Sequence, residues 1–198
     1  MVAIDWQGAM SKCAWITVAA TMLLLTPFAS LQAQTAELDP TLPTRAQNGE
    51  VAAQIQLGQA YATGKGEPQD GNQAVVWLSK AADQKSVDAY KALGELYRNG
   101  AGKHFARDLV QAVAWYRKAA EANDVESQGM LGVFYSYGQG VEQNYIEAYF
   151  WLDVAALAAG PKQAQYAANR QMIGQHITAD ELEAVQGRVA QWKAAHPR

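Results

Sequence analysis

Small and apolar residues recur every three or four positions in several stretches of this chain, which is the pattern of amphipathic helices. Three of these stretches contain a Leu-Gly pair that begins at Leu57, Leu93 or Leu131, so the pairs recur at intervals of 36 and 38 residues. A tyrosine follows each leucine by four residues, at Tyr61, Tyr97 and Tyr135. Because the tyrosines repeat in phase with the leucines, we expect them to pack in a core.

A second amphipathic helix is expected after each of these stretches. Its apolar stripes are Ala74, Trp77, Leu78, Ala81; Ala112, Trp115, Tyr116, Ala119; and Ala148, Trp151, Leu152, Ala155. The aromatic residues are expected to fill the spaces beside the alanines. Residues able to cap a helix precede each stripe, at Asp70, Asp108 and Asn144. The glycine of each Leu-Gly pair costs about 1 kcal/mol in mid-helix relative to alanine, so we expect a neighbouring helix to approach its backbone closely.

These correlated patterns resemble the Sel-1-like repeat family, relatives of the tetratricopeptide repeats. The motif A-x-x-x-L-G-x-x-Y-x-x-G-x-G followed by A-x-x-W-[YL]-x-x-A-A is matched at 53–82, 89–120 and, with serine in place of the first alanine, 127–156. The resemblance implies an all-α fold, a right-handed α-solenoid of helix-turn-helix units. It also implies an adaptor role in protein complexes, and it transfers no catalytic residue. We assign the repeats to 46–86, 87–124 and 125–160.

The pattern weakens at both ends of the repeat array. Residues 161–198 are interpreted as a half repeat and a C-terminal capping helix. Thr178 and Glu181 have the spacing of a capping box at the start of that helix. At the other end, two prolines in six residues predict that 34–45 is a linker.

Residues 1–33 have the pattern of a secretory signal peptide. The apolar run at 14–25 has 12 residues, fewer than the ~20 that span a bilayer, so a cleaved leader is favoured over a retained membrane anchor. The segment before Met10 holds an acidic residue and no basic one, which predicts that translation starts at Met10. Cleavage near Ala33 removes Cys13, the single cysteine of the sequence. We therefore expect a periplasmic or secreted protein without stable membrane insertion.

Composition and motifs narrow the possible functions. The 198 residues are 49% apolar and 18% charged with a net charge of -3, which gives no reason to expect a nucleic-acid partner. The mature region shows no nucleophile, phosphate-binding or zinc-ligand motif, and its histidines are scattered at His104, His176 and His196. We expect no catalytic residue, cofactor or metal. A cell-envelope hydrolase stays as the alternative, and self-association as a third.

The side of each first helix opposite its Leu-Gly stripe is expected to line the inner, concave face of the solenoid. Its residues differ from repeat to repeat, which is how a solenoid encodes one partner. They are Ile55, Gln59, Ala62, Thr63, Lys91, Glu95, Arg98, Asn99, Gly129, Val133, Ser136 and Tyr137. We predict that a protein or peptide partner binds Lys91, Glu95, Arg98, Asn99, Val133 and Tyr137. The predicted function is an exported, non-catalytic interaction scaffold of the bacterial cell envelope.

Overall fold

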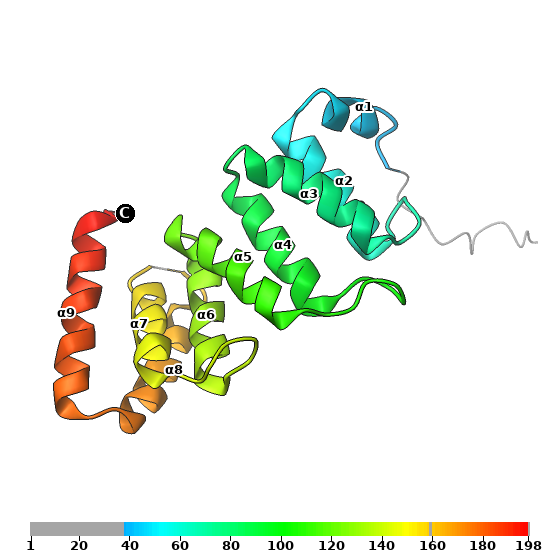
Figure 1. Ribbon diagram of the computed structural model, residues 1–198. Coiled ribbons are helices and arrows are strands. Elements are labelled where there is room, and N and C mark those ends of the chain that lie inside the picture. Colours follow the sequence, from blue (N-terminus) through cyan, green and yellow to red (C-terminus); the bar gives the residue numbers. More distant parts are fainter. Residues whose placement is uncertain (1–37, 159, 198) are drawn as a thin grey trace, which may run out of the picture. The chain divides into compact units, whose positions relative to one another are not determined.

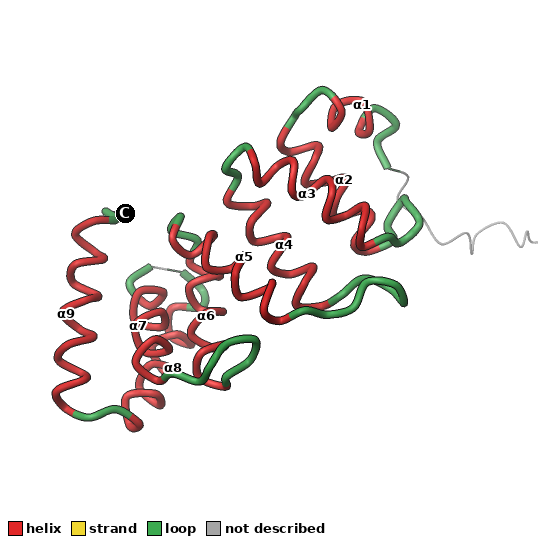
Figure 2. Tube along the Cα trace, viewed as in Figure 1, coloured by secondary structure: helices red, strands yellow, loops and turns green. Residues whose placement is uncertain are grey.

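The computed structural model describes residues 38–158 and 160–197, and its regular structure in these ranges is helical (Figures 1 and 2). The predicted signal peptide at 1–33 lies outside the described residues. Among the described residues, no helix is long and apolar enough to cross a bilayer. The elements are α1 (Leu42–Gln47), α2 (Val51–Thr63), α3 (Gly71–Asp83), α4 (Val87–Asn99), α5 (Leu109–Glu121), α6 (Val125–Tyr137), α7 (Tyr145–Ala156), α8 (Gln163–Ile173), the 3-10 turn η1 (Gly174–His176) and α9 (Ala179–Ala195).

Consecutive helices form three hairpins, in which α2 packs on α3, α4 on α5 and α6 on α7. We call α2, α4 and α6 the first helices of the three units. Each of α4, α6 and α8 also packs against the last helix of the preceding hairpin, so the hairpins stack in chain order. This arrangement confirms the all-α fold class and the α-solenoid architecture expected from the sequence.

The glycine of each Leu-Gly pair is a point of close helix contact. The contacting pairs are Gly58 with Leu78, Gly94 with Tyr116, and Gly132 with Leu152. A Cβ atom at Gly58 would lie 2.6 Å from Leu78 Cγ, which is closer than two non-bonded carbon atoms normally approach. The sequence predicts this close approach, which is tightest at Gly58 and Gly132, whereas a Cβ atom at Gly94 would lie 3.0 Å from the Tyr116 ring.

The tryptophans of the second helices do not make the contacts with the Leu-Gly glycines. Trp77 and Trp115 are half-buried, and the Nζ atoms of Lys80 and Lys118 lie 3.9 and 4.0 Å from their ring centroids. Trp151 is only 4% exposed. The expectation that tryptophan fills the core therefore holds for the third unit alone, and the residue after each tryptophan fills the space beside the glycine.

Side-chain caps begin the last helix of each hairpin, as the sequence predicts. The side chains of Asp70, Asp108 and Asn144 each accept a hydrogen bond from a backbone N–H in the first turn of α3, α5 or α7. Gly64 and Gly138 end α2 and α6 with φ of 74° and 64°, a left-handed conformation that costs glycine no steric strain. These caps and turns set the direction of each hairpin.

The N-terminal end of the array is covered by α1, which corrects part of the predicted linker at 34–45. The helix begins at Leu42 and buries Leu42 and Ala46 against Leu57 of α2. Pro43 lies in the first turn of α1, where the backbone N–H groups have no intrahelical partner. A proline there does not prevent helix formation, so apolar burial decides the conformation.

The C-terminal end is covered by α9, which packs on α7. Its first turn holds the predicted capping box, because the Thr178 hydroxyl accepts from the Glu181 N–H and the Glu181 carboxylate accepts from the Thr178 N–H. Val185 and Val189 of α9 join the core of the third unit. Trp192 lies beside Trp151, with ring centroids 5.4 Å apart.

Candidate protein-binding groove

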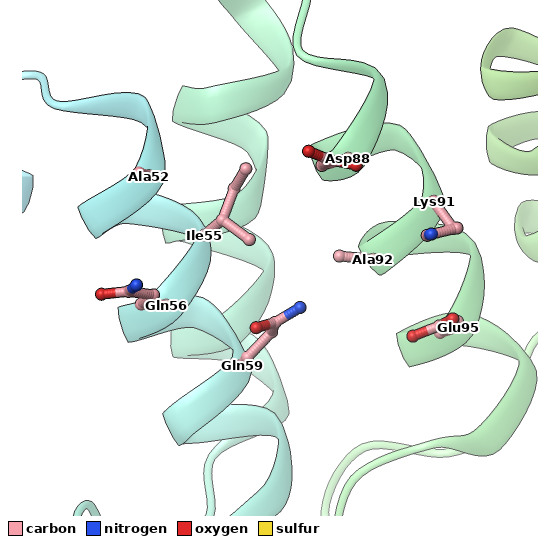
Figure 3. Close-up of a pocket in the computed structure, with 8 residues that line it drawn as sticks. All are labelled: Ala52, Ile55, Gln56, Gln59, Asp88, Lys91, Ala92 and Glu95. Carbon is pink, nitrogen blue, oxygen red and sulfur yellow. The ribbon is translucent and has the colours of Figure 1, made fainter. Parts of the chain in front are cut away.

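A groove with a volume of about 300 Å³ lies between α2 and α4, the first helices of units 1 and 2. It is lined by Ala52, Ile55, Gln56, Gln59, Asp88, Lys91, Ala92 and Glu95. Each of the four residues from α4 follows its counterpart in α2 by 36 positions, so the groove is built from equivalent positions of successive units. Figure 3 shows Ile55 and Gln59 pointing from α2 toward α4, with Ala92 and Glu95 pointing back.

The two walls of the groove differ in charge. Helix α2 has no charged side chain, whereas α4 supplies Asp88, Lys91 and Glu95. At 3.6 residues per turn, Asp88 and Glu95 lie on nearly the same side of α4, and Lys91 lies about 50° further round the helix. The carboxylates thus lie on the α2 side of the lysine.

The groove continues toward the C-terminal end of α2. A second hollow of about 390 Å³ shares Gln56, Gln59 and Glu95 with the first. Its remaining lining residues are Leu38, Ala60, Thr63 and Lys65. We call these two adjoining hollows, which share Gln56, Gln59 and Glu95, the channel along α2.

Side-chain contacts bridge the equivalent valley between α4 and α6. Lys91 Nζ lies 3.7 Å from a carboxylate oxygen of Glu126, and Arg98 Nη1 lies 3.6 Å from the sulfur of Met130. Lys162 also donates a 2.5 Å hydrogen bond to Glu126. This hydrogen bond and the positive charges of Lys162 and Lys91 hold the pKa of the Glu126 carboxyl below its usual value, against the opposing effect of partial burial.

Tyr166 of α8 fills part of the next valley, beside α6, where a hollow of about 290 Å³ lined by Val125, Glu126 and Tyr166 remains. The sequence places Gly129 on the open concave face, but the structure shows Gly129 buried against the Tyr166 ring, with no room for a Cβ atom. The expectation is wrong at this position because α8, the helix of the half repeat, packs where units 1 and 2 leave a groove. Burial also raises the pKa of the Tyr166 hydroxyl.

Comparison with known proteins agrees with this architecture. A family model described as the Sel1 repeat matches residues 51–86, 87–124 and 125–159. The chain belongs to the Sel1 repeat family. No curated protein matches it.

Two solved Sel1-type structures are similar to this chain. One is a Sel1 repeat protein from Oxalobacter formigenes, with 32% sequence identity and a TM-score of 0.52 over 63% of this chain and 92% of that chain. The other is a protective antigen present in uropathogenic Escherichia coli strains and displaying an SLR fold, with 25% identity and a TM-score of 0.49. That match covers 77% of this chain and 40% of the antigen.

Two of the six residues predicted to bind a partner, Lys91 and Glu95, line the groove of this Sel1 repeat array. The sequence prediction missed Ala52, Gln56, Asp88 and Ala92. The prediction took the helix face directly opposite the Leu-Gly stripe. The groove is instead lined by residues on the face that is turned toward the neighbouring first helix. The two equivalent i, i+3, i+4, i+7 stripes that begin at 52 and 88 are the sequence signal that identifies this face.

The other four predicted residues lie outside both hollows. Arg98 Nε donates to Asn99 Oδ1 over 3.3 Å at the C-terminal end of α4. Val133 is half-buried on α6, and Tyr137 is 71% exposed at the end of the same helix. A role for these four residues in partner binding stays a prediction.

The groove presents charged and hydrogen-bonding side chains to an occupant. Its eight lining residues include no serine, cysteine, histidine or tyrosine that could act as a nucleophile or neutral base. Within the described ranges, no group of three or more His, Cys, Asp or Glu residues is placed to hold a metal ion. The Gln56 and Gln59 carboxamides each provide a donor and an acceptor, and the carboxylates attract cations.

Proposed function

We propose that this protein is an exported, non-catalytic adaptor of the bacterial cell envelope that binds a peptide segment of a partner protein in the groove between α2 and α4. Sel1 repeat proteins are generally scaffolds for protein-protein interaction. The observation that carries the proposal is the open groove at equivalent positions of two successive units, lined by polar and charged side chains. The valley between α4 and α6 is bridged, and Tyr166 occupies the one beyond it.

The dimensions of the groove favour a peptide segment as its occupant. The lining residues of α2, from 52 to 59, span about 10 Å of helix axis. This is the length of about three residues of extended chain. The second hollow lengthens the path along α2. A linear segment therefore fits the channel better than the convex surface of a folded domain.

Site-specific photo-crosslinking tests the groove as the binding site. A photoreactive amino acid at Gln59 or Ala92, both groove residues, should form covalent adducts with a partner protein in the native host. The control position is Val110 on α5, which is 64% exposed and outside the groove. Adducts that form at Val110 with the same yield as at Gln59 would show that the binding surface lies elsewhere.

The proposal of export rests on the signal-peptide pattern at 1–33. Cell fractionation combined with N-terminal sequencing of the native protein tests it. A chain that begins near residue 34 in the periplasm or the medium is the expected result. Recovery of an uncleaved chain from the cytoplasm alone would contradict export without affecting the groove.

A further inference from the structure

The charged side chains of α4 are divided between its two neighbouring first helices. Lys91 and Arg98 contact side chains of α6, with which they bridge the α4–α6 valley. Asp88 and Glu95 instead line the groove beside α2. None of the described residues forms an ion pair with either carboxylate. The negative charges of the groove are therefore available to an occupant.

The two carboxylates have a defined spacing. Asp88 and Glu95 are seven residues apart on α4, which places them about 10.5 Å apart along the helix axis. The facing wall, α2, adds no charge, and the ion pair with Glu126 offsets only part of the positive charge of Lys91. An occupant with two positive charges about 10 Å apart is thus complementary to this wall.

A polyproline II segment presents side chains at this spacing. It has three residues per turn and rises about 3.1 Å per residue, so side chains i and i+3 point the same way about 9 Å apart. A β-strand places same-face side chains about 7 or 13 Å apart, which fits less well. We propose that the groove binds an extended partner segment with two basic side chains three residues apart, paired with Asp88 and Glu95. This inference rests on the proposed function and adds the chemistry of the partner.

The remaining lining residues suit the backbone of such a segment. A polyproline II helix makes no internal hydrogen bonds, so its peptide groups need partners. Gln59 of α2 points toward α4 and can donate to a carbonyl or accept from an N–H. Ile55 and Ala92 extend into the same space and provide apolar contact for the small side chains between the two basic residues.

Lys91 provides a test in which charge and structural damage have opposite effects. It lies between Asp88 and Glu95 along α4, so its ammonium group repels an incoming cation. Removing this charge should strengthen the binding of a basic segment, whereas damage to the groove would weaken it. Glu126 keeps its 2.5 Å contact with Lys162 in such a variant.

The probe is a synthetic proline-rich peptide with two lysines three residues apart. A matched peptide has glutamates at the same two positions. Titration of the lysine peptide into the ¹⁵N-labelled full chain should shift the amide resonances of residues 52–59 and 88–95, and the glutamate peptide should leave them unchanged. Raising the salt concentration from about 50 to about 500 mM should weaken the binding of the lysine peptide to the protein, because salt screens exposed charges.

Substitutions then assign the charges. Asp88→Asn and Glu95→Gln should each raise the Kd of the lysine peptide about threefold, and the double variant about tenfold. Lys91→Gln should lower the Kd of the lysine peptide about threefold, because it removes a positive charge that repels the peptide. Glu121→Gln is the matched control, since Glu121 is an exposed acid at the end of α5 outside the groove, and it should leave the Kd unchanged.

An unchanged Kd in the double variant, or equal binding of the glutamate peptide, would overturn the inference. The photo-crosslinking experiment separates this failure from failure of the proposed function. If adducts at Gln59 persist in the double variant, the groove still binds a protein, but recognition of a basic segment by Asp88 and Glu95 is contradicted. Loss of adducts at Gln59 and Ala92 in the otherwise unchanged protein would reject both.

Discussion

Gly129 of α6 lies against the ring of Tyr166 in α8, with no space for a Cβ atom between them. Position 129 is equivalent to Ile55 and Lys91 in the first two units, where side chains line the open groove. The same position thus serves as a groove wall in two units and as a packing surface for α8 in the third. The half repeat packs mainly on α7, and this contact adds its attachment to α6.

Gly129→Ala should separate α8 from α6 and lower the free energy of unfolding by about 1–3 kcal/mol, the usual cost of overpacking a tight contact. Urea denaturation measures this change. Gly187 of α9 is the control, because nothing lies within 4 Å of a Cβ atom built there. Gly187→Ala should raise the free energy of unfolding by about 0.5–1 kcal/mol, since alanine favours helix. Equal losses in both variants would argue against the packing role of Gly129.

The ion pairs of Glu126 should make part of the stability sensitive to acid. The folded protein holds the pKa of Glu126 below 4.5, its ordinary value, so the unfolded chain binds a proton more readily. The stabilisation is therefore present above pH 4.5 and is lost as the pH falls through the lower folded pKa. Because these side chains are partly exposed, Glu126→Gln should cost at most about 1 kcal/mol at pH 7.

Urea denaturation of the original and Glu126→Gln proteins at several pH values tests this sign. The difference between them should shrink as the pH drops below 4.5. Asp83→Asn, at an exposed position of α3, serves as the control that keeps Glu126 intact. A difference for Glu126→Gln that stays constant across the acid range would contradict the linkage.

Arg170 of α8 neutralises a buried carboxylate on α7. Asp153 is 8% exposed, and its Oδ1 atom lies 2.5 Å from Arg170 Nη1. Arg170→Ala should lower the free energy of unfolding by about 1–3 kcal/mol, because it leaves a buried charge without a partner. The further change Asp153→Asn in the same chain should recover part of that loss. Thermal unfolding followed by circular dichroism compares the three proteins, and no recovery in the double variant would show that the loss arises from packing.

Trp192 should hold the α9 cap on the third unit. Its ring centroid lies 5.4 Å from that of Trp151 and 5.9 Å from that of Phe150. Trp192→Ala should cost about 2–4 kcal/mol, somewhat less than for a fully buried tryptophan, and should expose Trp151 to acrylamide quenching. Lys193→Ala, at the neighbouring exposed position, should change neither property. Unaltered quenching in Trp192→Ala would mean that α9 stays in place without this contact.

Local sequence patterns predicted the helical hairpins, and long-range contacts account for the errors. The regular recurrence of the Leu-Gly pair identified Gly58, Gly94 and Gly132 as points of close helix contact. Such contacts can be predicted because each one lies between the two helices of a single hairpin. Two prolines predicted a linker where α1 forms, since the burial of Leu42 depends on α2. The sequence predicted only some of the groove residues. It indicated the approximate helix face, but it did not show how far that face turns toward the neighbouring unit.

The sequence by itself determined the all-α repeat, its register and its caps, because these follow from side-chain periodicity and from hydrogen bonds within a few residues. Only the tertiary structure decided which side chains line or fill each valley between first helices. Lys91 reaches Glu126 and Tyr166 covers Gly129, and each pair joins residues of different units. The groove beside α2 is likewise lined by side chains of two units, so its location depends on packing between units that no single repeat specifies.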